Sequence, residues 1–456
     1  MLPTMLRDSQ THHECLMEIH NMLNTTPTEN LNHDYLQQLF QRHIERMRYK
    51  ERLNNETVHT KIQKDECPIY REAQAKWEET IKERLQGLSD VSGYPTTKPR
   101  ESTSVEKYSI SALWDKHCEF DINSIGHFIS AEELRPLIKP LQNQQKALDV
   151  NELLDQFRPL LTATILDEDE GHVLASCSYD RVRNLLQTRG CSNENRLRLW
   201  GLVLGLSSAA DNEVRYEYVR RLVLDYDCLI DKFLFKDIRT RASNDDQFFV
   251  FEEQVFQILL AFQRETLSED LTTFSSSMIV PNVILAAPSA LVAPVCFVTS
   301  SMPDAFHIFS TLAKRYFAYL TRLTSNRNGI VNLFHVFNSI ISLLKPKLFE
   351  HLLPITVEEE ILDILLSAFA GPLAADQVLI LWDTMIGFDS TLVLALLAVG
   401  VVLTRQKALE ACDNRPKLRE LLQNLRDVQV IPTLKFVLGQ LEMLGSTMNS
   451  RFLDSS

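Results

Sequence analysis

The sequence predicts an all-α protein. Apolar residues recur three and four positions apart through most of the chain, whereas the alternating pattern of a half-buried strand is nearly absent. The most hydrophobic run, residues 392–403, is apolar on every side, which is typical of a helix buried inside a protein. Because a membrane span needs about 17 to 25 apolar residues, this run is too short to cross a bilayer, and direct membrane insertion is not expected.

Composition excludes several classes of function. A formal net charge of -13 argues against nucleic acid as a partner, because phosphate backbones are bound by basic surfaces. The eight cysteines are scattered and form no Cys-x-x-Cys pair, so neither a metal site nor a secreted disulfide framework is expected. No glycine-rich phosphate loop, dinucleotide turn or nucleophile elbow occurs. We therefore expect a cytoplasmic protein without a cofactor or metal of its own.

The chain divides into five regions on its pattern of apolar residues and breakers. Trp77, Ile81 and Leu85 form a helical stripe near the end of the first region, and Pro95 and Pro99 follow in a stretch rich in serine and threonine. The predicted regions are an N-terminal helical region (1–88), a flexible linker (89–107), a helical lead-in segment (108–176), the main helical domain (177–446) and a tail (447–456).

Helix boundaries are marked by cap residues. Ser130 with Glu133, and Thr356 with Glu359, have the spacing of capping boxes. Within the main domain, periodicity and caps predict helices over residues 180–188, 195–205, 211–233, 247–266, 288–298, 304–323, 328–344, 357–369, 374–386, 390–406, 416–426 and 431–444.

One helix, predicted over 195–205, carries an unusual anchor. Trp200, Val203 and Leu204 share a face, Arg196 lies one turn before the tryptophan, and Gly205 is placed where a helix would stop. On spacing alone, Trp200 is interpreted as a buried tryptophan in an ordinary helical core.

Several segments in a fixed order resemble the TBC domain, the Rab GTPase-activating module. They are the Arg-x-x-x-Trp helix of Arg196 and Trp200, the preceding turn at Gly190, the Ala-Pro pair ending at Pro294, and the Leu-Trp-Asp sequence that contains Trp382 and Asp383. The resemblance implies a TBC helical fold for residues 177–446. It also implies a partner, a Rab-family small GTPase in its GTP-bound form, which itself holds the nucleotide and magnesium.

TBC domains supply an arginine that neutralises charge developing on the transferred phosphate. In the family this arginine follows the pattern apolar-x-x-Asp-x-x-Arg, and the matching run here begins at Leu234 and contains Asp237. Thr240 occupies the arginine position, and Arg239 and Arg241 flank it. The resemblance therefore implies a displaced arginine finger at Arg239 or Arg241. The alternative is that both are exposed loop arginines.

TBC domains also supply a glutamine that orients the attacking water, in a Tyr-x-Gln-Gly-Met motif six residues before Ala-Pro. Counting back from Pro294 places Ala286 in the glutamine position and Pro288 in the methionine position. Alanine has no amide with which to orient a water. The nearest polar residues, Asn282 and Ser289, are displaced from that position.

Three functional hypotheses remain open at this point. The first is a TBC-fold regulator that binds a Rab GTPase with weak or absent activation, because Ala286 replaces the glutamine. The second is a working activator that uses Arg239 or Arg241 and relies on the GTPase's own glutamine. The third is a helical adaptor that binds no GTPase. A protein partner for the N-terminal helices and recruitment to membranes through a Rab are further expectations.

Overall fold

The computed structural model of the chain describes residues 68–92, 97–99, 129–144, 149–162, 170–176, 178–206, 209–243, 245–273 and 285–453. The helices predicted within residues 1–67 lie outside the described residues. So do residues 100–128 of the predicted linker and lead-in segment, and Asn282.

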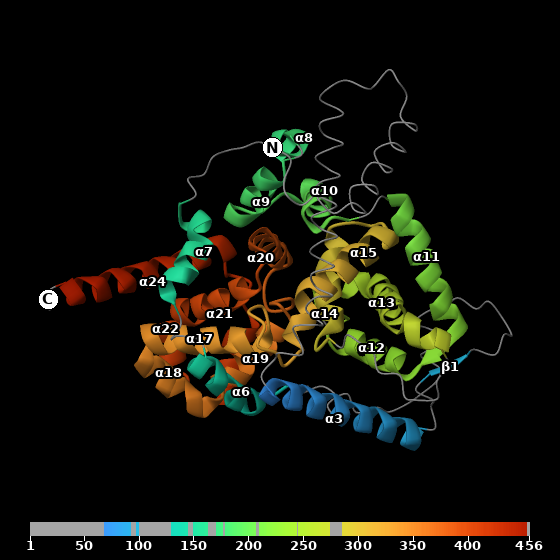
Figure 1. Cartoon of the computed structure of the whole chain (residues 1–456), viewed down its shortest axis with the longest axis horizontal. Helices are drawn as coiled ribbons and strands as arrows, with labels where there is room; N and C mark the ends of the chain where they lie inside the picture. Colours follow the sequence, from blue (N-terminus) through green and yellow to red (C-terminus); the bar gives the residue numbers. More distant parts are fainter. Residues whose placement is uncertain are drawn as a thin grey trace, which may run out of the picture. The chain divides into compact units, whose positions relative to one another are not determined.

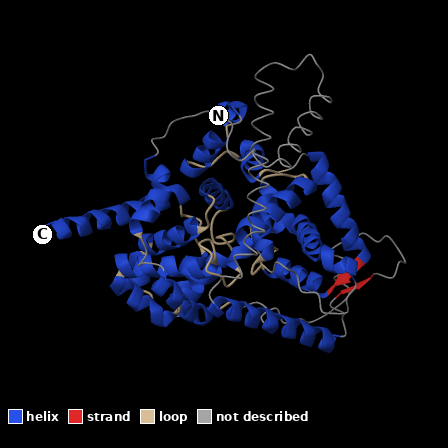
Figure 2. Cartoon of the chain, viewed as in Figure 1, coloured by secondary structure: helices blue, strands red, loops and turns tan. Residues whose placement is uncertain are grey.

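The described part of the chain is built from helices, as predicted (Figure 2). Its N-terminal half contains α3 (Pro68–Ser92), β1 (Thr97–Pro99), α6 (Ala131–Gln144), α7 (Val150–Thr162), α8 (Glu170–Ser176), α9 (Tyr179–Thr188), α10 (Asn193–Leu204), α11 (Ala209–Asp225), β2 (Tyr226–Cys228), α12 (Leu229–Thr240), η3 (Phe249–Phe251) and α13 (Glu252–Thr273). Its C-terminal half contains α14 (Pro288–Val292), η4 (Ala293–Phe297), α15 (Met302–Leu312), η5 (Ala313–Phe317), α16 (Ala318–Leu320), α17 (Ile330–Leu344), α18 (Pro346–Leu352), η6 (Leu353–Ile355), α19 (Val357–Leu366), α20 (Ala375–Phe388), α21 (Leu392–Thr404), α22 (Gln406–Glu410), α23 (Arg415–Gln423) and α24 (Val430–Leu453).

Within the described residues, β1 and β2 pair antiparallel in a two-stranded sheet. Its register places Thr97 opposite Cys228 and Pro99 opposite Tyr226. The predicted helix over 211–233 is therefore wrong in the middle, because this strand separates α11 from α12. The three-residue strand has no sequence signal of its own, since its stability comes from pairing with a distant segment.

The regions predicted at the two ends of the chain contain regular structure beyond their expected limits. Helix α3 continues to Ser92, and β1 lies inside the segment predicted as a linker. Helix α24 continues to Leu453, inside the predicted tail. The described part of the N-terminal region contacts both the lead-in segment and the main domain. The buried Tyr70 hydroxyl donates to the carbonyl oxygen of Leu137 in the lead-in segment at 2.9 Å, and the N–H of Leu323 in the main domain donates to Gln74 Oε1 at 2.9 Å.

Of the three predicted helix caps, at Gly205, Ser130 and Thr356, two are confirmed and one is wrong. Gly205 ends α10 with a left-handed φ of 67°. At α6, Glu133 accepts from the Ser130 backbone N–H at 2.9 Å, and Ser130 Oγ accepts from the Glu133 N–H at 3.3 Å, so the capping box is present. At α19, Thr356 adopts a left-handed φ of 65° and its side chain caps nothing. Glu359 instead accepts from the Ala131 N–H at 3.0 Å.

Two predicted helices are interrupted by other helix types. The segment over 288–298 is α14 followed by the 3-10 helix η4, and the change occurs at Pro294, which has no N–H to continue an α-helical ladder. The segment over 304–323 contains the π-helix η5 between α15 and α16.

The apolar run at 392–403 forms the centre of the core, as expected for a helix buried on all sides. Every residue from Leu392 to Leu403 is buried, and α21 packs between α17 and α24 (Figure 1). Gly400 is required for this packing, because a Cβ there would lie 2.4 Å from Thr433 Cγ2 on α24. Among the described residues, no helix combines the length and apolar character needed to cross a membrane.

Candidate functional site

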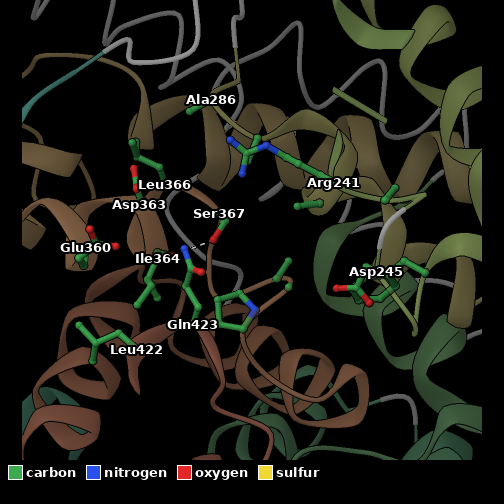
Figure 3. A pocket seen from close by; sticks show the side chains of 17 residues that line it. Arg241, Asp245, Ala286, Glu360, Asp363, Ile364, Leu366, Ser367, Leu422 and Gln423 are labelled. Carbon is green, nitrogen blue, oxygen red and sulfur yellow. Dashed lines mark hydrogen bonds between the residues drawn. The ribbon is translucent and has the colours of Figure 1, made fainter. Parts of the chain in front are cut away.

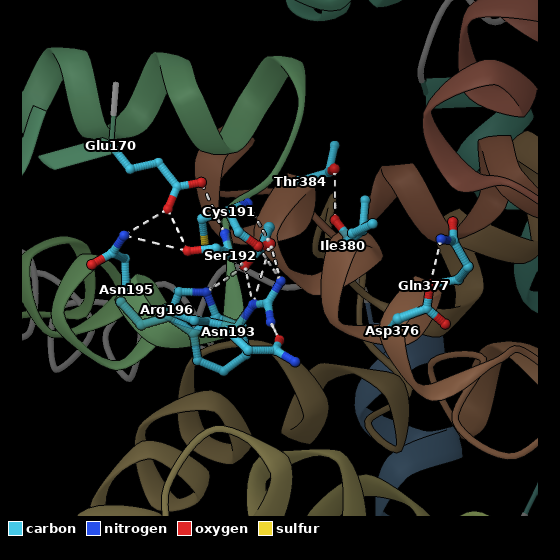
Figure 4. A network of polar contacts seen from close by, with 12 residues as sticks. Glu170, Cys191, Ser192, Asn193, Asn195, Arg196, Asp376, Gln377, Ile380 and Thr384 are labelled. Carbon is cyan, nitrogen blue, oxygen red and sulfur yellow. Dashed lines mark hydrogen bonds and ion pairs between the residues drawn. The ribbon is translucent and has the colours of Figure 1, made fainter. Parts of the chain in front are cut away.

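The two sequence motifs that contain tryptophan meet in the interior of the protein. Asp383 on α20 is fully buried, and its carboxylate accepts hydrogen bonds from Arg196, Trp200 and the Cys191 N–H. Arg196 on α10 donates from Nε and Nη2 at 3.1 and 3.0 Å, and Trp200 donates from Nε1 at 2.7 Å. Arg196 also donates to the Cys191 carbonyl oxygen at 2.5 Å (Figure 4). A charge buried this deeply is tolerated because it is paired and fully hydrogen-bonded.

The turn between α9 and α10 completes this network. Gly190 has a left-handed φ of 77°, and a Cβ there would lie 3.0 Å from Asp383 Oδ2, so glycine suits both the backbone and the close approach. The next backbone N–H, of Cys191, donates to Asp383 Oδ2 at 3.0 Å. Burial raises the pKa of the Cys191 thiol, which keeps it protonated and unreactive.

These motif residues hold the fold and do not face a partner. Arg196, Trp200 and Asp383 are all buried, and their polar atoms bond one another. The interpretation of Trp200 as a buried core tryptophan is confirmed. The network joins the start of the main domain to α20, which lies in the middle of the helices around it (Figure 1).

A pocket of about 400 Å³ lies elsewhere, between the end of α12 and the helices α19 and α23. It brings together two residues that the sequence analysis singled out, Arg241 and Ala286 (Figure 3). The polar side chains lining it among the described residues belong to Arg241, Asp245, Glu360, Asp363, Ser367 and Gln423.

Arg241 is half-exposed in this pocket and is held by one carboxylate. Its Nε lies 2.9 Å from Asp237 Oδ1, one helical turn earlier, and 49% of its side-chain surface remains exposed. Asp237 Oδ2 also accepts a hydrogen bond from the Ser289 N–H at 2.9 Å. This carboxylate thus caps the first turn of α14, because the N-cap residue Ala287 has no polar side chain. Burial raises the pKa of Asp237, against the opposing effects of Arg241 and Ser289.

Arg239 points away from the pocket. Residues two apart on an α-helix are rotated by about 200° relative to each other, so Arg239 and Arg241 cannot serve the same face. Arg239 Nε lies 3.0 Å from Glu252 Oε1, and its guanidinium carbon lies 5.5 Å from the centre of the Phe235 ring. Arg239 is not among the residues that line the pocket.

The segment that follows Ala286 begins a helix at its proline, as expected. Pro288 is the first residue of α14, as predicted, and Ala286 packs partly buried against the core. Ser289, one of the two displaced polar alternatives, is fully buried and bonded to Asp237, so it is directed away from solvent. The amide that does line the pocket is Gln423, at the end of α23. Sequence reasoning missed it because no local motif surrounds it.

The lining of the pocket is acidic. Glu360 is buried and bonded by Arg415 and Arg419 at 2.8 and 3.0 Å, so its charge is compensated. Asp245 and Asp363 add two more carboxylates. Burial, with a smaller effect of the neighbouring Asp246, raises the pKa of Asp245. Among the charged side chains that line the pocket, Arg241 is thus the cation, and the other three are carboxylates.

One wall of the pocket is a strained turn after α19. Ala368 and Phe369 have φ values of 46° and 65°, a region that residues with a Cβ rarely adopt. The buried Trp382 holds this turn, because its Nε1 donates to the Ala368 carbonyl oxygen at 3.2 Å. Trp382 therefore contributes to the shape of the pocket from behind.

Residues 286–409 match the family model of the Rab-GTPase-TBC domain. The match begins at Ala286 and includes Pro294, Trp382 and Asp383, whereas Arg239 and Arg241 precede it. The chain is 31% identical over 272 residues to human TBC1 domain family member 19, an alignment that covers 55% of this chain and 52% of that protein. The chain thus spans about half the length of this curated relative.

Two solved structures are similar at a lower level. The TBC domain of the Chlamydomonas flagellar RabGAP matches 68% of this chain and 95% of that domain, at 12% identity and a TM-score of 0.42. The Ypt/Rab-GAP domain of Gyp1p matches 66% of this chain and 99% of that domain, at 12% identity and a TM-score of 0.44. Residues 286–409 are thus similar to the Rab-GTPase-TBC domain, and the Arg-x-x-x-Trp and Leu-Trp-Asp motifs form one buried network in this chain.

Proposed function

We propose that the chain binds a Rab-type small GTPase in its GTP-bound form and stimulates GTP hydrolysis weakly or not at all. The observation that carries this proposal is that Arg241 and Ala286 line the same pocket. In this arrangement a cation remains where an arginine finger would act, and the position of the water-orienting amide holds only a methyl group.

Arg241 is suited to reach a partner. Its ion pair with Asp237 joins residues one turn apart on a half-exposed surface, and pairs of this kind are worth about 0.3–0.5 kcal/mol. Little free energy is therefore needed to release its guanidinium toward a phosphate. The planar, permanently charged guanidinium is the group that best stabilises a transferring phosphoryl group.

Two features support weak stimulation. Ala286 cannot orient water, so any hydrolysis depends on the GTPase's own glutamine. Asp245 and Asp363 line the pocket beside Arg241 and oppose the approach of a phosphate. Arg241 must act against this negative field.

A second candidate is a working activator that relies on Arg241 and the glutamine of the GTPase. The half-exposed side chain of Arg241 favours it. Arg239 is the weaker candidate, because it is engaged with Glu252 and Phe235 outside the pocket. In either case we propose that membrane association occurs through the bound GTPase, and a partner for residues 1–88 stays a prediction.

The test combines binding with single-turnover hydrolysis across a panel of Rab GTPases. We expect at least one Rab to bind more tightly when loaded with a non-hydrolysable GTP analogue than with GDP, with hydrolysis raised far less than the about 10³–10⁵-fold of an arginine finger. Arg241→Ala is expected to remove the stimulation that remains. Arg239→Ala is the matched control and is expected to leave it unchanged.

Each other outcome assigns the function differently. If no Rab binds in either nucleotide state, the chain is an adaptor and the proposal is wrong. If hydrolysis is stimulated strongly and Arg241→Ala removes it, the second candidate is correct. If only Arg239→Ala lowers hydrolysis, the assignment of the arginine is wrong.

A further inference from the structure

The part of the chain that precedes the main domain is joined to two walls of the pocket. One wall is the end of α12, which carries Arg241, and the other is formed by α19 and α23. Helix α3, strand β1 and helix α6 connect to both walls, and we call these three elements the N-terminal brace. Helix α3 has 25 residues, so it is about 37 Å long, and it extends from α6 toward β1 (Figure 1).

Helix α6 is docked on the first turn of α19 by two neighbouring glutamates. Glu358 is buried and accepts a hydrogen bond from Arg135 Nε at 3.0 Å. Glu359 accepts from the N–H of Ala131, the first residue of α6, at 3.0 Å. The next residue, Glu360, lines the pocket, so the turn of α19 that holds α6 is also part of the pocket wall.

The other end of the brace is joined to α12 through β2. Strand β1 pairs with β2, and the fully buried Arg264 fixes β2 by donating from Nη2 to the Tyr226 carbonyl oxygen at 2.9 Å. The same guanidinium bonds Asp231, in the first turn of α12, at 2.6 Å. Because α12 is one continuous helix, the position of β2 constrains the end of α12 that carries Arg241.

Helix α3 connects these two attachments. Near its start, Tyr70 is fully buried and its hydroxyl donates to the Leu137 carbonyl oxygen of α6 at 2.9 Å. One turn later, Gln74 Oε1 accepts from the Leu323 N–H at 2.9 Å. Four residues separate Ser92, the last residue of α3, from β1. A rigid helix held near both ends transmits a displacement at one attachment to the other.

We propose that the N-terminal brace holds the two pocket walls in their relative positions, and that release of the brace weakens GTPase binding. The docked brace pre-organises the pocket, so a GTPase does not have to order the walls when it binds. The face of α3 that contains Tyr70 and Gln74 is occupied by these contacts, so a protein partner that binds this face releases the brace. The effect on binding rests on the proposed function, whereas the effect on the walls does not.

Native-state hydrogen exchange of the full chain measures the walls without a GTPase. The amide of Ser243, bonded to the Ile238 carbonyl oxygen at 2.8 Å, reports on the α12 wall. The amide of Phe369, bonded to the Ile364 carbonyl oxygen at 3.0 Å, reports on the α19 wall. Exchange of such bonded amides requires local opening, so its rate measures how firmly each wall is held.

The release variant combines Tyr70→Phe with Gln74→Ala, which removes both hydrogen bonds of α3 described above and keeps the buried ring. We expect both reporter amides to exchange about 10-fold faster in this variant. Arg135→Ala should accelerate mainly the Phe369 amide, because it frees α6 from α19 alone. Arg158→Ala is the matched control, since it removes a 66% exposed arginine whose ion pair lies on the surface, and it should change either rate less than about twofold.

A disulfide supplies the opposite perturbation. Thr97 lies opposite the native Cys228 in the register of β1 and β2. Residues directly opposite each other in an antiparallel pair are close enough for a disulfide. Oxidised Thr97→Cys should therefore exchange the Ser243 amide more slowly than wild type, and dithiothreitol should restore the wild-type rate. Wild-type chain oxidised in the same way controls for the other cysteines.

The dissociation constant for each Rab loaded with a GTP analogue is then measured with the same variants. We expect the release variant to bind about 10-fold more weakly, because the GTPase must order the walls itself. Oxidised Thr97→Cys should bind at least as tightly as wild type. Arg158→Ala should bind within about twofold of wild type.

The outcomes separate this inference from the proposed function. If the release variant accelerates neither reporter amide, or only one, the brace does not couple the walls and the inference is overturned. It is also overturned if Thr97→Cys does not oxidise with Cys228, or if release leaves GTPase binding unchanged or tightens it. If wild-type chain binds no Rab while both amides respond to release, the proposed function is overturned and the effect of the brace on the walls is supported.

Discussion

Replacing Asp383 by asparagine should destabilise the protein severely, although the side chain keeps its size. Asp383 is fully buried and neutralises the guanidinium of Arg196, which is itself buried. Removing one partner of such a pair costs about 3–5 kcal/mol, because the other charge stays buried without compensation. The new amide NH2 would also face the indole N–H of Trp200, which now donates at 2.7 Å. We therefore expect a loss of about 3–5 kcal/mol, a large part of a typical stability of about 5–15 kcal/mol.

The assay is urea unfolding followed by tryptophan fluorescence and circular dichroism. With an m-value of about 3 kcal/mol/M, this loss lowers the midpoint by about 1–2 M. Asp155→Asn is the matched control, since Asp155 is 65% exposed and pairs on the surface with Arg158, and it should cost less than about 1 kcal/mol. The combination Arg196→Met with Asp383→Leu should recover part of the loss. A midpoint for Asp383→Asn within about 0.3 M of wild type would refute the reasoning.

Three further predictions concern packing, acid stability and the pocket amide. Gly387→Ala should destabilise the protein by about 1–3 kcal/mol in urea unfolding, because the new Cβ would lie 2.7 Å from a backbone nitrogen of α9. Gly201→Ala is the control and should leave the stability unchanged, because no atom lies within 4 Å of a Cβ there. Equal unfolding midpoints for the two variants would contradict this prediction. Burial acts to raise the pKa of Glu265, but Lys314 and a neighbouring arginine outweigh it and hold the pKa below its usual 4.5. The ionised Glu265 carboxylate therefore stabilises the fold above that pH, and this contribution is lost as the pH falls. The stability difference between wild type and Glu265→Gln should shrink between pH 6 and 3, and a constant difference would contradict the assignment. Gln423→Ala should leave GTP hydrolysis unchanged, and a tenfold fall would identify Gln423 as the amide that orients water.

The sequence was sufficient for those parts of the fold that depend on local signals. The apolar run of α21, the glycine that ends α10 and the capping box at Ser130 each act within a few residues, and each is confirmed. The box at Thr356 failed because η6 ends with a left-handed residue at that position, and Glu359 bonds a distant backbone N–H instead. The strand that separates α11 from α12 depends on a partner far away in the chain.

The residues that line the pocket were harder to predict from the sequence than the helices were. The sequence placed Arg239 and Arg241 as equal candidates, because both lie beside the family position of the arginine. The structure separates their positions, because the end of α12 directs Arg241 into the pocket and Arg239 toward Glu252. Gln423 reaches the same pocket from a helix far along the chain, and no spacing rule connects such positions.

The central claim is that the molecule keeps a cation for a GTPase and lacks the amide that would orient water. It is tested most directly by single-turnover GTP hydrolysis of a bound Rab at saturating wild-type chain and Ala286→Gln. The account predicts weak stimulation by wild type and a larger rate for Ala286→Gln at unchanged affinity. Stimulation by wild type of about 10³-fold or more, with no gain in Ala286→Gln, would contradict it.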